Sequence, residues 1–141
     1  AETQQDLFRQ LHESDAVLEG KTALIVDDDI RNIFAMTSIL EQHRMNVVPA
    51  ESGKDAIRLL QERHDVDIVL MDIMMPDMDG YETIRNIRRV ARLKSLPIVA
   101  VTAKAMKGDR EKCLQAGAWD YLSKPVDPEY MLGVLRAWLH R

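Results

Sequence analysis

Short apolar runs alternate along the chain with segments in which apolar residues recur every three or four positions. Three runs are continuous and rich in Val, Ile and Leu, which is typical of strands buried on both faces of a parallel sheet. They cover residues 22–26, 67–71 and 97–101. Two weaker runs, 45–50 and 120–123, complete five expected strands. Pro49 cannot donate a ladder hydrogen bond, so the run that contains it is expected at an edge of the sheet.

Segments of helical periodicity separate these runs. Their apolar residues lie three or four positions apart, so each helix would present one buried stripe. The stripes contain Ile33, Met36 and Leu40; Ala56, Ile57 and Leu60; Ile84 and Ile87; and Met131, Val134, Leu135 and Trp138. Residues 105–118 are expected to hold a further helix, with Gly117 near its C-terminal end. The alternation predicts an α/β fold with a mostly parallel sheet and right-handed crossovers.

Residues 1–20 lie outside this alternation. Leu7, Phe8 and Leu11 are at helical spacing, so a short helix is one interpretation. A linker is the other, and we favour it because chain ends order only where something holds them down. We therefore predict a linker over residues 1–20 and one domain over residues 21–141.

Composition narrows the class of protein. The chain has 141 residues, of which 46% are apolar and 30% charged, as in a globular domain with a real core. A net charge of −4 argues against a nucleic-acid surface. No apolar run approaches the ~20 residues that span a bilayer, and the polar N-terminus lacks a signal-peptide pattern. The single cysteine, Cys113, excludes a disulfide framework within the chain, so a cytoplasmic setting is expected.

Polar side chains follow the expected strands at the point where each apolar run ends. They are Asp27, Asp28 and Asp29 after the first run, Asp72 after the third, Thr102 after the fourth and Lys124 after the fifth. Each has an ordinary explanation by itself, since an aspartate such as Asp29 often caps the next helix. Together they indicate a site, because ligands of open α/β sheets bind at the carboxyl ends of the strands.

The chemistry of this set points to phosphoryl transfer. Clustered carboxylates repel one another unless a hard cation such as Mg²⁺ joins them, and Mg²⁺ prefers oxygen ligands. A lysine offers a point charge to phosphate oxygens, and a threonine offers a hydroxyl donor. A carboxylate can itself attack phosphorus and become an aspartyl phosphate. Asp72 is the best candidate nucleophile because it stands alone on a central strand, facing the pair on the first.

At this point the chain resembles a response-regulator receiver domain over about residues 21–141. The matching stretches are "LIVDDD", "VLMDIMMPDMDG", "VAVTAKA" and "YLSKP", in that order and on the expected strands. The resemblance implies a doubly wound (βα)5 fold with five parallel strands in the flavodoxin-like order 2-1-3-4-5.

The resemblance also implies a role for each site residue. Asp72 would be the phosphoacceptor. Asp28 would bind Mg²⁺ directly, Asp27 would help through water, and the main-chain carbonyl of Met74 would complete the protein ligands.

The remaining implied roles concern the phosphoryl group and the response to it. Thr102, Lys124 and the main-chain N–H of Ala103 would bind the phosphoryl group, and the Lys124–Pro125 bond would be cis. Tyr121 would be the switch aromatic that fills the space vacated when Thr102 rotates; it could equally be an ordinary half-buried strand residue.

Longer stretches of the sequence, such as "DIMMPDMDGYETIRNIR", resemble those of receivers attached to hybrid sensor histidine kinases. The chain starts with alanine rather than methionine, so it is expected to belong to a longer protein. Its partners would be a histidine kinase domain or a histidine phosphotransfer protein, with no nucleic acid and no direct membrane contact. Met74 and Lys104 are long side chains that could hinder an attacking water, which suggests slow self-dephosphorylation.

Three other functions are compatible with part of this pattern. A haloacid-dehalogenase-type phosphatase also uses an aspartate and Mg²⁺, but its motif needs Thr or Val where Arg31 stands. A receiver-like module that takes no phosphate would lack one of the acids, the threonine or the lysine, and all are present here. A nucleotide or flavin binder would need a glycine-rich loop, whereas the six glycines of this chain are scattered.

Overall fold

The computed structural model describes residue 3 and residues 16–103 and 107–140. Several predictions therefore lie outside the described residues. These are the helical spacing of Leu7, Phe8 and Leu11, the first residues of the helix expected over 105–118, and the side chain of Lys104.

Five parallel strands form one sheet in the order β2-β1-β3-β4-β5, which confirms the predicted topology. The strands are β1 (Thr22–Val26), β2 (Asn46–Ala50), β3 (Ile68–Asp72), β4 (Ile98–Thr102) and β5 (Asp120–Ser123). The strand with Pro49 is at the edge, where a missing N–H costs no ladder bond. Asp72 and Thr102 are the last residues of their strands rather than the residues after them, because Asp72 still pairs with Val101 and Thr102 with Ser123.

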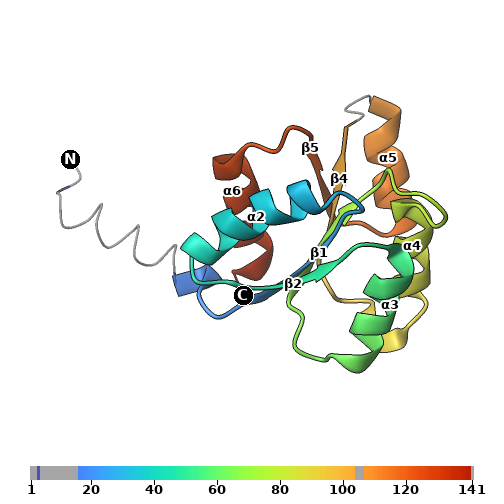
Figure 1. Ribbon diagram of the computed structural model, residues 1–141, viewed down its shortest axis with the longest axis horizontal. Helices are drawn as coiled ribbons and strands as arrows, with labels where there is room; N and C mark the ends of the chain where they lie inside the picture. The colour runs from blue at the N-terminus through green and yellow to red at the C-terminus, as the bar shows by residue number, and fades with distance from the viewer. Residues whose placement is uncertain (1–2, 4–15, 104–106, 141) are drawn as a thin grey trace.

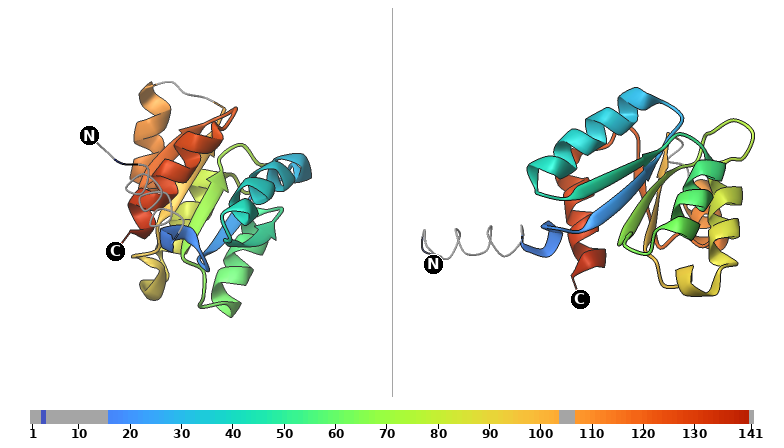
Figure 2. Two further views of the ribbon diagram at one scale, coloured as in Figure 1. Left: turned by 90° about the vertical axis from the view of Figure 1, so that its left-hand side faces the viewer. Right: turned by 60° about the horizontal axis from the view of Figure 1, so that its bottom comes forward.

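Helices cover both faces of the sheet (Figure 1). They are α2 (Ile30–Gln42), α3 (Gly53–Glu62), α4 (Gly80–Arg88), α5 (Lys107–Ala116) and α6 (Pro128–Leu139), and a short 3-10 helix, η1 (Ala91–Leu93), precedes β4. Figure 2 shows α2 and α6 on one side of the sheet and α3, α4 and α5 on the other. None of the described helices combines the length and the apolar character that a bilayer crossing requires.

The two faces of the sheet carry separate halves of the core because side chains alternate along each strand. Leu24 and Val26 pack with Leu60 and Ile84, on the side of α3, α4 and α5. Ala23 and Ile25 lie on the opposite face, in the cluster that also contains residues of α2 and α6. The strands β1, β3 and β4 are therefore buried at every position, which explains why their sequences are continuous apolar runs.

Four helices begin at a side chain that caps their free backbone N–H groups. Asp29 accepts from the N–H of Arg31, which confirms it as the N-cap of α2. Ser52, Asp79 and Asp127 act in the same way for α3, α4 and α6. These caps fix where each helix starts, and so fix the length of the loops at the carboxyl ends of the strands.

The packed region extends a short way before β1. Residues 16–18 form a helical turn, and Leu18 is fully buried in the cluster that holds α2 and α6. The turn is joined to the body of the domain by the N–H of Gly20, which donates to the carbonyl of Arg44.

Candidate functional site

The polar residues predicted at strand ends converge at one edge of the sheet. Asp27 follows β1, Asp72 closes β3, Thr102 closes β4 and Lys124 follows β5. The two aspartates and Thr102 are at most 2% exposed, although each is polar. Burial of polar groups is costly without partners, so their arrangement must supply those partners.

Lys124 supplies the countercharge. Its Nζ lies 3.1 Å from Oδ1 of Asp72 and 3.3 Å from Oδ2 of Asp27. Its main-chain N–H donates to the carbonyl of Thr102 over 2.8 Å, which ties the loop after β5 to the end of β4. The Lys124–Pro125 peptide bond is cis, as the resemblance implied.

Three carboxylates form an acidic cluster. One oxygen from each of Asp27, Asp28 and Asp72 lies within 4.8 Å of the others. Asp27 also accepts from the N–H of Asp29 over 2.8 Å, and Asp72 accepts from the N–H of Met74 over 3.4 Å. Asp28, unlike Asp27 and Asp72, is exposed to solvent. An all-oxygen donor set of this kind, with one member open to solvent, fits a hard divalent cation that retains some of its waters.

Burial perturbs the charges of the central pair. Desolvation raises the pKa of Asp72 to about 6, and the neighbouring charge of Asp27 adds to the rise, while the hydrogen bond from Lys124 opposes it. For Lys124, burial disfavours the ammonium, but the bonds to Asp72 and Asp27 outweigh burial and raise its pKa above the ordinary value. The lysine therefore stays charged, and it only partly compensates the two acids that it touches.

Gly80 was not among the residues predicted for the site, yet it shapes the loop that follows Asp72. Its N–H donates to the carbonyl of Ile73, which turns the chain from β3 into α4. A Cβ at this position would lie 2.4 Å from the carbonyl oxygen of Asp72 and 2.7 Å from Cα of Ile73. The sequence carried a usable signal, since a glycine directly after the capping Asp79 opens the helix.

The other predicted residues lie around this cluster. The Met74 side chain is 54% exposed, and Ala103 is exposed beside the end of β4. Tyr121 on β5 is half-buried against the α3–α5 side of the core, and the Arg110 guanidinium lies 5.6 Å from its ring centroid. These positions leave both interpretations of Tyr121 open.

A doubly wound α/β domain with three acids, a threonine and a lysine at the carboxyl ends of its strands is the class that the fold and the site define. The chain belongs to the response regulator receiver domain family, whose model matches residues 23–136.

Two curated relatives illustrate the range of proteins that carry this domain. The chain is 38% identical to the protein PilH of Pseudomonas aeruginosa over 116 residues, which cover 82% of this chain and 95% of that protein. It is equally identical to the signal transduction histidine-protein kinase BarA of Escherichia coli over 114 residues, 81% of this chain but only 12% of that kinase. This chain thus spans nearly all of one relative and a small part of the other.

Solved structures agree with this assignment. The receiver domain of a sensor histidine kinase from Pseudomonas aeruginosa PAO1 superposes with a TM-score of 0.79 at 37% identity, covering 86% of this chain and 99% of that domain. That crystal structure has a magnesium ion coordinated in its active-site cleft. A putative response regulator from Chloroflexus aurantiacus superposes with a TM-score of 0.82 at 30% identity, covering 87% of this chain and all of that one.

Proposed function

We propose that this receiver domain accepts a phosphoryl group on Asp72 from a phosphohistidine of a histidine kinase domain or a histidine phosphotransfer protein. One observation carries the proposal: Asp72 is a buried carboxylate that touches the Lys124 ammonium at 3.1 Å and lies in a cluster with Asp27 and Asp28. A purely structural ion pair would need one carboxylate, whereas Lys124 contacts two, so the site carries more negative than positive charge.

In the proposed transfer, a carboxylate oxygen of Asp72 attacks phosphorus. The new O–P bond forms as the N–P bond of the phosphohistidine breaks, and the electron pair of that bond remains on the imidazole nitrogen. Among the described residues, the hydrogen bonds that Asp72 accepts both go to Oδ1, so Oδ2 is the oxygen that we assign to the attack. Lys124, the Thr102 hydroxyl and the N–H of Ala103 would then bind the phosphoryl oxygens.

We further propose that the acidic cluster holds Mg²⁺. Asp28, Asp72 and the carbonyl of Met74 would be direct ligands, and Asp27 would act through a water. The bound ion supplies positive charge near the phosphoryl oxygens. Support comes from the spacing of the three carboxylates and from the magnesium in the related receiver from Pseudomonas aeruginosa.

The response to phosphorylation is proposed to involve Thr102 and Tyr121. Thr102 would turn towards the phosphoryl group and Tyr121 would move into the space beside it. The Thr102→Val variant tests this, because it keeps the shape of the side chain and removes the hydroxyl. We expect phosphorylation to shift the ring resonances of Tyr121 in the wild type and not in the variant; equal shifts in both would contradict the switch.

We propose that the domain works in the cytoplasm as part of a hybrid sensor histidine kinase. Relatives at 35–38% identity include histidine kinases of which this chain matches 12–14%. A separate response regulator is the alternative, favoured by the match to nearly all of PilH. An antibody against this domain decides between them: on an immunoblot of the source cells, a band several times larger than 16.1 kDa supports the hybrid kinase, and a band near that mass supports the separate protein.

The phosphoacceptor is tested by intact mass after incubation with acetyl phosphate. We expect one added phosphoryl group with Mg²⁺, none with EDTA and none in Asp72→Asn. Asp65→Asn is a matched control, because Asp65 is exposed and pairs only with Arg63 among the described residues; it should behave like the wild type. An adduct that persists in Asp72→Asn would place the acceptor elsewhere, and free phosphate released without an adduct would indicate rapid turnover.

A further inference from the structure

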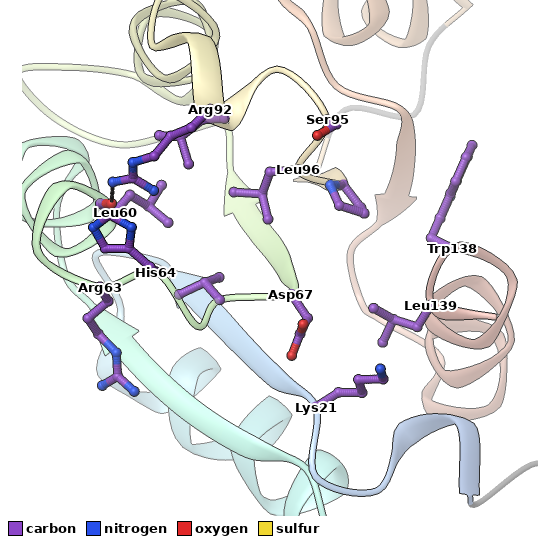
Figure 3. Close-up of a pocket in the computed structure, with 13 residues that line it drawn as sticks. Lys21, Leu60, Arg63, His64, Asp67, Arg92, Ser95, Leu96, Trp138 and Leu139 are labelled. Carbon is purple, nitrogen blue, oxygen red and sulfur yellow. Dashed lines mark hydrogen bonds between the residues drawn. The ribbon is translucent and has the colours of Figure 1, made fainter. Parts of the chain in front are cut away.

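A pocket with a volume of about 310 Å³ lies at the edge of the sheet opposite to Asp72. Three of its residues precede strands: Lys21 comes before β1, Asp67 before β3 and Pro97 before β4. It is therefore built at the amino ends of the strands and shares no residue with the acidic cluster (Figure 3). Its size is within the range of small-molecule sites.

One end of the pocket is cationic. Arg92 and His64 lie close together on this side in Figure 3, and Arg92 donates to the carbonyl of Leu60. Among the described residues, neither Arg92 nor Lys21 forms an ion pair. Lys21 lies away from Arg92, beside Leu139 (Figure 3). Arg63 also lines the pocket, but Asp65 holds its guanidinium with two bonds, so it is not a free anchor.

The charge of the lining differs in sign from that of the whole chain. Lys21, Arg63 and Arg92 oppose a single lining carboxylate, Asp67, which accepts from the N–H of Thr22 over 2.8 Å. Counting these four groups together with Asp65, which pairs with Arg63, leaves a net charge of +1 in a chain whose net charge is −4. A concave site of this sign concentrates anions.

The other end of the pocket is apolar and aromatic. Trp138 stands across from Arg92 and His64, beside Leu139 (Figure 3). Two contacts hold the indole of Trp138 in place. Its ring centroid lies 5.3 Å from that of Trp119, and its N–H donates to Asp120 over 3.1 Å. A flat ring could stack on this aromatic surface without displacing it.

The wall between the two ends is also held in place. The half-buried Arg88 donates to the carbonyls of Leu93 and Leu96 at 2.7 Å each and to that of Gly117 at 2.9 Å. Its guanidinium carbon lies 5.5 Å from the ring centroid of Trp119. Arg88 therefore joins the segment that carries Arg92 to the aromatic pair that positions Trp138. A preformed site loses less entropy when a ligand binds.

We propose that this pocket binds a nucleoside phosphate, with its phosphates at Arg92 and His64 and its base against Trp138. The ligand class follows from the two ends together, since a cationic end suits phosphate oxygens and a fixed indole suits a planar ring. Binding here does not require phosphorylation of Asp72, because the pocket shares no residue with the acidic cluster.

The first test uses the wild-type chain, so it does not depend on a variant that folds. ADP is titrated in EDTA while the amide and indole N–H resonances are followed by NMR. We expect saturable shifts of the Trp138 indole and of Ser95, with none at Asp27, Asp28 or Asp72. Absence of shifts up to about 5 mM ADP, or shifts confined to the acidic cluster, would overturn the proposal.

Two further arms separate the contributions of the ligand. Adenosine and pyrophosphate should each bind more weakly than ADP; pyrophosphate binding as tightly as ADP would mean an anion site with no role for Trp138. Arg92→Gln should lower the affinity for ADP about tenfold, as loss of a charged hydrogen bond implies. Lys94→Gln is the matched control, since Lys94 is an exposed cation two residues away that does not line the pocket. An equal loss of ADP affinity in both variants would mean that only the overall positive charge matters, and would contradict the site.

Discussion

The ammonium of Lys124 lies 3.1 Å from Asp72 and 3.3 Å from Asp27, although these residues are separated by 52 and 97 positions in the chain. One cation thus faces two buried carboxylates. Removal of the cation and removal of one carboxylate should consequently have opposite effects on the stability of the metal-free domain.

Lys124→Met removes the cation and leaves two buried acids facing each other. We expect the metal-free variant to lose about 1–3 kcal/mol of unfolding free energy at pH 7.5, because a buried charged group loses its partner. Urea denaturation in EDTA measures this loss. The loss should shrink near pH 4, where Asp72 is protonated; an equal loss at both pH values would mean that packing of the lysine stem, not its charge, is what matters.

Asp72→Asn should stabilise the metal-free domain at neutral pH. The folded-state pKa of Asp72 is about 6, above its ordinary value of 3.8, so the folded state holds the proton more tightly than the unfolded state. The stability linked to this group is fully present below pH 3.8 and is lost as the pH rises through 6. The amide variant has no such loss, and the shift of about two units corresponds to about 3 kcal/mol at pH 7.5.

The same denaturation assay in EDTA checks the Asp72→Asn prediction at several pH values. The unfolding free energy gained over the wild type should increase between pH 4 and pH 7 and be nearly constant above pH 7. Asp67→Asn is the control, because Asp67 is also partly buried but lies away from Asp27 and Lys124 and accepts from the main-chain N–H of Thr22; its effect should not follow this profile. If the Asp72→Asn variant is less stable than the wild type at pH 7.5, then Lys124 stabilises the Asp72 carboxylate by more than burial and Asp27 destabilise it, and the prediction is wrong.

The sequence was sufficient to predict the buried strands and the polar residues at their ends. It was not sufficient to predict some of the residues that hold the fold together. Strands buried on both faces must be apolar at every position, and their polar ends then stand out, so Asp72 and Thr102 could be found. Arg88 could not, because arginine on a helix is ordinarily solvated, and only the fold brings three backbone carbonyls to its guanidinium. Leu18 was also missed, since the apolar run Ala16–Leu18 is too short to show a periodicity.

Two glycines in helices should respond oppositely to alanine. At Gly80 a methyl group would meet the backbone of Asp72 and Ile73, so Gly80→Ala should destabilise by about 1–3 kcal/mol and impair phosphorylation of Asp72. At Gly133, in the middle of α6, nothing lies within 4 Å of the new carbon. Gly133→Ala should therefore stabilise by about 0.5–1 kcal/mol through helix propensity. Thermal melts of both variants test the pair, and a stabilised Gly80→Ala would mean that α4 can shift away from β3.

Met74 is expected to slow loss of the phosphoryl group from Asp72. Met74 lies two positions after Asp72, the last residue of β3, and its side chain is 54% exposed. A long apolar side chain at this position can hinder an attacking water. Replacing it by asparagine, together with Lys104→Ala, should speed phosphate release several-fold, measured as decay of the phosphorylated mass after the donor is removed. Leu114→Asn, an equally polar change at an exposed position on α5, should leave the decay unchanged. Unchanged decay in the double variant would contradict the hindrance.

Cys113 should be inert while the domain is folded. It is fully buried beside Tyr81 between α4 and α5, and burial raises its pKa, so very little thiolate forms at pH 8. A disulfide reagent such as DTNB therefore reaches it only when the domain opens. We expect a reaction at least about a hundredfold slower in buffer than in 6 M guanidinium chloride, with a rate that increases in destabilised variants such as Gly80→Ala. Fast labelling of the folded wild type would show that α5 opens locally without unfolding of the sheet, and hydrogen exchange of the α5 amides would then have to be equally fast.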